Sequence, residues 1–573
     1  MFKLNDKMLQ ANLFGMVQIF PAGVKKMLDK SWAPAFRKLV FEKINEERYA
    51  VLYSDIPSRP NFPVNVWVGL EIIKGMFDYT DEELIQHWHF DLLTAYALGQ
   101  EGLGELTLSI RTIYYNRERL LEYENKTGCN LLEEEFHAFT ADAIKVFNVS
   151  TRSQRMDTTF AGSFIRQMSR LELVVKVLQN FYNDLTETEQ KHWQPLLEEY
   201  IGDEAQHLSF RLKRSEVEGH LKKVGEWLFK LHESYADDDV LTGFKSYQHI
   251  GRIVNELYRV MTDKEKTVIE LKPAKEVSAS SLQNPADDIA TYRVKGGEAH
   301  VGDIINVTET CTTGNPLQLV TDVAAYPNTK ADEAIAAERV PLIKQRMELD
   351  EMITDGGFSG EISEKACDTE GVTLIPTEIL GAKLSQDRLY LKDFHFADNE
   401  VATCPACQSP ESKLQSEKTG RWIIHFSREQ CTGCAMVKKC PVAERKRFYS
   451  ISFTDRQSVL AQRRQQFGEE EYRQKCRLRP AIEGTISLFK HPMKDDKLRV
   501  HSFGRVRDVI VLMAIGINFR RICAYLVKQV KQQPAWARQS VYFALIRLSM
   551  VFTVGARQLW ENYFHQRLVT MKI

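Results

Sequence analysis

The chain of 573 residues lacks any apolar run near 18 residues, the length that a membrane-spanning helix needs. Its most apolar stretch, residues 509–517, has only the length of a core segment. The chain also lacks a positively charged start followed by an apolar segment, which is the pattern of a secretory signal. We therefore expect a soluble, cytoplasmic protein, and this compartment argues against disulfide bonds among its cysteines.

The sequence has almost no net charge, −1 at pH 7, which excludes a uniformly basic nucleic-acid-binding protein. The charge is unevenly distributed, however. Residues 441–573 carry 25 Lys or Arg against 10 Asp or Glu, a net charge of about +15, and the remainder is about −16. A cationic C-terminal segment beside an acidic remainder indicates one face that binds DNA. The charge alone would also fit a basic surface that is merely solvated and binds no DNA.

With 43% hydrophobic residues, a chain of this length is too long for one core, so we expect about three or four structural units. The sequence predicts this division: a helical N-terminal module (1–150), a first core strand (151–163), a helical insertion (164–285), the main part of the core (286–400), a cysteine-rich insertion (401–450) and a basic C-terminal part (451–573). The N-terminal module is interpreted as a DNA-end reader or dimerisation unit, or else as a helical scaffold without DNA contact.

Three acidic residues stand in informative settings. Asp157 lies in Met-Asp-Thr-Thr-Phe, Asp355 follows a predicted strand at 351–354, and Glu483 lies in Arg-Pro-Ala-Ile-Glu-Gly-Thr. A lone Asp is usually a turn former or helix cap, but two Asp at strand ends and a Glu on a later helix can be folded together. Three such carboxylates can hold two Mg²⁺ ions, which activate an attacking oxygen and stabilise a leaving oxygen in phosphodiester cleavage.

Glu483 also belongs to the pattern Arg-x3-Glu-x6-Lys, formed with Arg479 and Lys490. On a helix, intervals of four and seven residues place all three side chains on one face. One carboxylate for metal and two flanking cations for phosphate form a suitable nuclease surface.

Together these motifs resemble the DDE transposases of bacterial insertion sequences, in particular the group with the signature Tyr-x2-Arg-x3-Glu-x6-Lys. Residues 63–99, with Asp-Tyr-Thr-Asp-Glu-Glu-Leu at 78–84, resemble the helical N-terminal module of that superfamily. One position departs from the signature, because Cys476 stands where the signature has Tyr. Tyr472 is nearby but out of register, so the role of the signature Tyr is unassigned.

The resemblance implies an α+β, largely helical protein with a ribonuclease-H-like mixed-sheet core. It implies catalysis by Asp157, Asp355 and Glu483 with two Mg²⁺ or Mn²⁺ ions, cleavage at the ends of an insertion sequence, and joining of the 3′-hydroxyls to target DNA. Arg479 and Lys490 would neutralise phosphates, and Thr158 would help to position the backbone. The partners would be double-stranded transposon-end and target DNA and further copies of the chain, as a homodimer or higher oligomer in the bacterial cytoplasm at the nucleoid.

Two other functions stay open at this stage. The chain could be a DNA-binding regulator derived from a transposase and devoid of chemistry. It could also be a metal-dependent DNA nuclease without strand transfer. Arg166 and Arg170, close in sequence to the first acid, are further candidates for DNA contact, although a solvated helix face explains them equally well.

The ten cysteines fall into two sets. Five are scattered and are expected to be small buried hydrophobic residues. The other five gather within 37 residues: Cys404, Cys407, Cys431, Cys434 and Cys440. Two C-x2-C knuckles at this spacing predict a structural Zn²⁺ held by four of the five thiolates, with the position of Cys440 in or out of the set left open. The basic and aromatic run at 418–426 is interpreted as a ribbon strand, with stacking on unpaired bases as the alternative.

Overall fold

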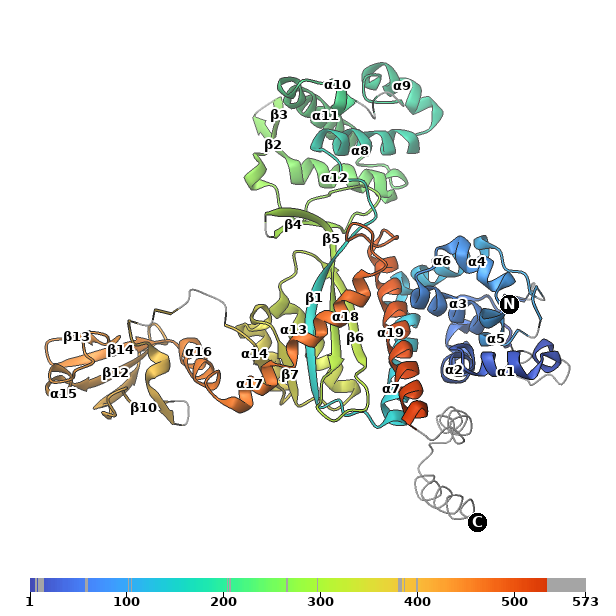
Figure 1. Cartoon of the computed structure of the whole chain (residues 1–573). Coiled ribbons are helices and arrows are strands. Elements are labelled where there is room, and N and C mark those ends of the chain that lie inside the picture. Colours follow the sequence, from blue (N-terminus) through green and yellow to red (C-terminus); the bar gives the residue numbers. More distant parts are fainter. Residues whose placement is uncertain are drawn as a thin grey trace, which may run out of the picture.

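The computed structural model describes residues 1–5, 8, 15–56, 60–100, 102–104, 106–202, 205, 208–263, 266–295, 297–379, 384–385, 387–397 and 400–532. The end of the predicted basic C-terminal part, residues 533–573, lies outside these residues. The fold is α+β, with a mixed sheet at the centre and helices on both of its faces (Figure 1).

The central sheet has six strands. Its order is β4-β5-β1-β7-β8, and β6 pairs with β5 next to β4, on the edge that faces away from β1. β5 runs antiparallel to β1 and β6, whereas β1, β7 and β8 run parallel to one another. The strands are β1 (Ser153–Gly162), β4 (Thr291–Lys295), β5 (Glu298–Thr310), β6 (Val320–Pro327), β7 (Glu351–Thr354) and β8 (Thr373–Pro376).

The two faces of the sheet are covered by different helices. On one face, Met156 of β1 packs with Ala336, Val340 and Ile343 of α13 (Asp332–Arg346), next to α14 (Glu361–Thr369). On the other face, β6 lies against α19 (Phe503–Gln532) and α7 (Leu131–Phe147). Successive side chains of a strand point to opposite faces, so the odd and even residues of β1 meet different partners.

The N-terminal helices share their hydrophobic core with the far end of the chain. That core runs from Leu28 through the N-terminal helices, takes in β5 and β6, and ends at Leu526. The helices are α1 (Ala22–Asp29), α2 (Ala33–Leu39), α3 (Val64–Phe77), α4 (Asp81–Phe90), α5 (Leu92–Ala97), α6 (Ile110–Thr127) and α7. Helix α4 begins with a capping box, since Thr80 and Glu83 bond reciprocally.

The long helix α19 packs directly on α3. A Cβ at Gly75 would come 3.0 Å from the backbone of Leu512, and a Cβ at Gly516 would come 3.0 Å from Cα of Met76. Glycine therefore permits backbone-to-backbone contact at both positions. By length and composition α19 could cross a membrane, but 67% of its most apolar window is buried in the protein. The sequence had predicted only a nine-residue apolar core segment here, because arginines interrupt the apolar pattern on either side.

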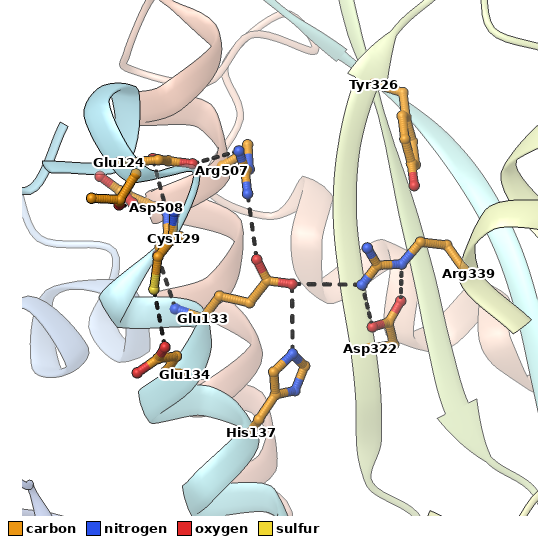
Figure 2. A network of polar contacts seen from close by, with 12 residues as sticks. Glu124, Cys129, Glu133, Glu134, His137, Asp322, Tyr326, Arg339, Arg507 and Asp508 are labelled. Atoms are coloured by element: carbon orange, nitrogen blue, oxygen red, sulfur yellow. Dashed lines mark hydrogen bonds and ion pairs between the residues drawn. The ribbon is translucent and has the colours of Figure 1, made fainter. Parts of the chain in front are cut away.

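A polar network joins α6, α7 and α19 to the sheet (Figure 2). Arg507 of α19 pairs with Glu124 of α6 and with Glu133 of α7. Glu133 also lies 3.6 Å from Arg339 of α13, which bonds the fully buried Asp322 of β6 at 2.8 Å. The contacts form one chain of charges from the N-terminal helices to the sheet.

The insertion after β1 forms a body of its own, with a separate hydrophobic core. As predicted, it is mainly helical. The body ends in a β-hairpin, which the sequence did not predict. The alternating pattern of the hairpin follows a helix without a break, so no boundary is visible in the sequence. The elements are α8 (Arg170–Asp184), α9 (Glu187–Leu197), α10 (Leu208–Arg211), α11 (Arg214–Ser234), α12 (Lys245–Leu257), β2 (Tyr258–Asp263) and β3 (Lys266–Leu271).

The cysteine-rich unit projects from the side of the sheet opposite to α19 (Figure 1). It contains β9 (His395–Ala397), β10 (Glu400–Thr403), β11 (Ser412–Gln415), β12 (Trp422–Ser427), α15 (Arg428–Thr432), β13 (Ala443–Glu444) and β14 (Phe448–Phe453). The chain returns to the sheet through α16 (Asp455–Gln466), α17 (Glu470–Cys476) and α18 (Ile482–Lys490). The basic and aromatic run therefore contains an ordinary ribbon strand, β12.

Candidate acidic site

The register of β1 and β7 brings the first two acids together. Arg155 of β1 pairs with Ile353 of β7 in a parallel ladder. Two residues further along both strands, Asp157 and Asp355 occupy neighbouring positions. Asp355 caps a short 3-10 turn, with its Oδ1 accepting a hydrogen bond from the amide of Gly357 at 2.8 Å. The predicted strand ending at Asp355 is confirmed as β7.

A buried glutamate docks the helix that carries the third acid. Glu309 of β5 is fully buried and accepts hydrogen bonds from Arg155, Thr485 and Arg521. Because these three partners come from β1, α18 and α19, Glu309 fixes α18 against the sheet. Ile482, Thr485 and Phe489 face inward at helical spacing. Glu483 therefore lies on the outer face of α18, with a side chain 63% exposed.

Arg479 lies between the three acids. Its Nη2 is 2.7 Å from Oδ2 of Asp157 and 3.9 Å from Oδ2 of Asp355, and its Nη1 is 2.8 Å from Oε1 of Glu483. It belongs to a 3-10 turn, residues Arg479–Ala481, that precedes α18. The sequence placed Arg479, Glu483 and Lys490 on one helix, whereas Arg479 sits before the helix and reaches back over the strands.

Burial and charge act on the acids in opposite directions. Burial raises the pKa of Asp157 to about 6, and the Asp355 charge adds to this rise. The Arg479 guanidinium and the amide of Thr158 oppose it. The donor set consists of hard carboxylate oxygens, which suits Mg²⁺ or Mn²⁺. As the side chains stand, no three His, Cys, Asp or Glu groups in the described part of the chain are placed to hold a metal ion, and in the acidic triad the guanidinium lies where they converge.

A fourth carboxylate, Asp332 at the start of α13, adjoins this site. Its Oδ1 accepts a hydrogen bond from Oγ1 of Thr158 at 3.0 Å. A Cβ at Gly357 would lie 3.1 Å from both Oδ2 of Asp332 and Oδ1 of Asp355, so two carboxylates flank one point. Burial and the Asp355 charge raise the pKa of Asp332. Sequence reasoning missed this residue, because an Asp at a helix start normally signals only a favourable dipole contact.

The other predicted site residues take different positions. Thr158 turns its hydroxyl to Asp332, away from the face of Asp157. Lys490 lies on α18 and bonds Asp496 at 3.2 Å. Arg166 pairs with Glu172, and Arg170 is the first residue of α8.

Neither candidate for the signature Tyr lies among the acids. Cys476 packs with Leu478 against the small cluster formed by Cys311 and Ile353. Tyr472 donates its hydroxyl to the carbonyl of Pro376 at the end of β8, at 2.9 Å. Both side chains therefore serve the contact between α17 and the sheet.

The predicted zinc-binding cysteines divide into four and one. Cys404, Cys431, Cys434 and Cys440 line one small cavity in the cysteine-rich unit, whereas Cys407 is exposed. This unit lies away from β1, β7 and α18, the elements that carry the acidic site (Figure 1).

One comparison with known proteins gives a match. A family model described as a transposase DDE domain matches residues 403–523. The matched segment contains the five clustered cysteines and Glu483, while Asp157 and Asp355 precede it. No curated protein and no solved structure matches the chain. The match confirms the resemblance to DDE transposases that the sequence motifs indicated.

Proposed function

From the match of residues 403–523 to a transposase DDE domain, we propose that this protein is a DDE-type DNA transposase whose acids are Asp157, Asp355 and Glu483. The observation that carries the proposal is the convergence of these acids, from two neighbouring strands and a later helix, on one guanidinium. Each is more than 100 residues from the next in the sequence, and the last lies in the matched segment.

The strand order supports a ribonuclease-H-like core. In the order β6-β5-β1-β7-β8, only β5 is antiparallel to its neighbours. The strands β1, β7 and β8 are therefore adjacent and parallel, and the hairpin of β5 and β6 lies beside β1. The first acid then falls on the central strand and the second at the end of its parallel neighbour. Ligands of such sheets bind outside the carboxyl ends of the strands, which is where Asp355 lies.

The acids would hold two Mg²⁺ or Mn²⁺ ions once Arg479 turns toward a phosphate. Bound there, the ions supply activation of the attacking oxygen and stabilisation of the leaving oxygen. Arg479 can exchange a carboxylate for a phosphate because its planar fork suits both. Lys490, on the outer face of α18 with Glu483, adds a second cation for the DNA backbone.

The proposed reaction has two steps. Water attacks a phosphodiester at the end of the element, and the released 3′-oxygen takes a proton to become a hydroxyl. That 3′-hydroxyl then attacks a phosphodiester of the target DNA and displaces a target 3′-oxygen. One phosphodiester replaces another in the second step, so neither ATP nor a covalent enzyme intermediate is needed.

We further propose that the protein acts on double-stranded DNA in the cytoplasm of a bacterium, as a homodimer or higher oligomer. Two ends of one element must be handled together, which favours at least two active sites. The positive charge of residues 441–573, beside an acidic remainder, supports one DNA-binding face.

The test is a cleavage and joining assay with Mg²⁺ or Mn²⁺ on DNA that carries the sequences flanking this gene. The chain should cut the ends and join them to target DNA. Asp355→Asn and Glu483→Gln should each lose both activities by at least about 10³-fold, because the loss of a ligand to a catalytic ion removes several kcal/mol of transition-state stabilisation. DNA binding should be retained.

A matched control is Glu348→Gln, which alters an exposed carboxylate whose one ion-pair partner among the described residues is Arg152. It should cut and join like the unmodified chain. Full activity in Asp355→Asn would overturn the assignment of the acids. Tight binding without cutting by the unmodified chain would support a regulator, and cutting without joining would support a nuclease.

A further inference from the structure

The cysteine-rich unit has too small a core to hold its fold by apolar burial alone. Its buried cluster comprises seven residues: Phe394, Val401, Cys404, Ile424, Phe426, Ile451 and Phe453. The unit stands away from the sheet and has its own two small sheets (Figure 1). Units of this size normally need a disulfide or a metal as a staple. Each of its cysteines is a free thiol, so no disulfide supplies one.

Four thiols of the unit line a single cavity of about 20 Å³. Cys404 enters it from the turn after β10, Cys431 from α15, and Cys434 and Cys440 from the turns that follow. A cavity of this size holds roughly one water molecule or one ion.

The fifth cysteine stays outside the cavity. Cys407 is exposed, does not line the cavity, and has a φ of 59°. The same turn also holds the side chain of Cys404, because the amide of Gln408 donates a hydrogen bond to Sγ of Cys404 at 3.4 Å. The first C-x2-C knuckle therefore offers one sulfur to the cavity, whereas the second offers two.

We propose that Cys404, Cys431, Cys434 and Cys440 bind one structural Zn²⁺ as a tetrathiolate, with Cys407 outside the coordination shell. Four thiolates in a closed tetrahedral set select Zn²⁺ over hard cations. In the described residues the thiols are not yet at coordinating positions, so binding turns the side chains inward around the small cavity. The ion would tie α15 and the following turns to the end of β10. This inference does not depend on the proposed reaction.

The test measures zinc in the purified full-length chain by mass spectrometry. We expect about one zinc per chain. Ser in place of each of the four cavity cysteines should lower the zinc content to less than about half. Cys407→Ser, which alters the same turn as Cys404→Ser without entering the cavity, should keep one zinc per chain.

A second measurement covers the case in which the cavity variants fail to fold. Zinc X-ray absorption on the unmodified chain should show four sulfur neighbours at about 2.3 Å. The proposal is overturned if Cys407→Ser loses zinc as fully as Cys404→Ser. It is equally overturned by iron with visible absorption, by a mixed nitrogen or oxygen shell, or by a metal-free chain in which the unit is folded. Asp355→Asn should bind the same zinc, which separates this result from any failure of DNA cleavage.

Discussion

At the scale of single residues, Arg479 sets the electrostatics of the acidic site. Three ionised carboxylates and one guanidinium leave two negative charges at one point of the surface. This surplus attracts cations, while the exposed position of Glu483 keeps the site open toward solvent. A guanidinium in contact with all three acids also holds their geometry, because like charges on three free carboxylates would drive them apart.

Asp332 provides a residue-scale test of the extent of this site. Asp332→Asn keeps the size of the side chain but removes a charge facing Asp355. If the ions bind as proposed, about 10- to 100-fold more Mg²⁺ should be needed for half-maximal cleavage, as for other groups behind a metal ligand. The measurement is cleavage rate against Mg²⁺ concentration. Glu361→Gln, an exposed change on α14, serves as the control; an unchanged Mg²⁺ dependence for Asp332→Asn would remove Asp332 from the site.

The buried acid Asp303 of β5 predicts a pH dependence of stability. It is 1% exposed, its oxygens have no hydrogen-bond partner among the described residues, and burial with the Asp287 charge raises its pKa to about 7. Because the folded pKa exceeds the unfolded value, the protonated carboxyl stabilises the fold at low pH. That contribution disappears as the pH rises from about 4 to about 7.

Asp303→Asn removes this titration. At pH 8 the variant should unfold at a Tm several degrees higher than the unmodified chain, because a buried charge costing on the order of a few kcal/mol is gone. At pH 4 the two should have nearly equal Tm. The two Tm values are measured by thermal unfolding, monitored by circular dichroism at both pH values. The exposed change Asp239→Asn should leave Tm unchanged. Equal shifts at both pH values would contradict the assignment.

At the scale of elements, the contact between α3 and α19 depends on glycine. Gly516→Val should destabilise the protein by about 1–3 kcal/mol, because the added side chain meets the backbone of Met76. The matched control is Gly219→Ala in α11, where a Cβ meets nothing within 4 Å. It should stabilise the helix by about 0.5–1 kcal/mol. Chemical unfolding of both variants measures the difference, and similar stabilities would show that α3 and α19 are not in close contact.

At the scale of the whole molecule, the charge network of Figure 2 holds the N-terminal helices against the sheet. Asp322 is its most buried member and pairs with both Arg339 and Arg346. These guanidinium groups hold the pKa of Asp322 below its usual range. The pairing therefore stabilises the fold above the unfolded pKa and is lost only as the pH falls through the lowered folded value.

Asp322→Ala should cost about 3–5 kcal/mol at neutral pH, since it removes the nearest counter-charge of both Arg339 and Arg346 at a buried site. Arg152→Ala, which breaks only exposed pairs, should change stability by less than about 0.5 kcal/mol. Chemical unfolding at pH 7 compares them. Equal changes in the free energy of unfolding for the two substitutions would mean that the network contributes little to the packing of the N-terminal helices on the sheet.

The sequence by itself determined the local elements and the chemistry of single motifs. Strand β7 up to Asp355 and the helical insertion follow from patterns within a few residues, because the periods of strands and helices are local properties. The gathering of five cysteines was equally visible. Tertiary structure decided what depends on contacts between distant segments: Asp332 beside Asp355, Arg479 among the acids, Cys407 outside the cavity, and one core shared by the N-terminal helices and α19. Such contacts depend on register and packing across hundreds of residues, and no local pattern encodes them.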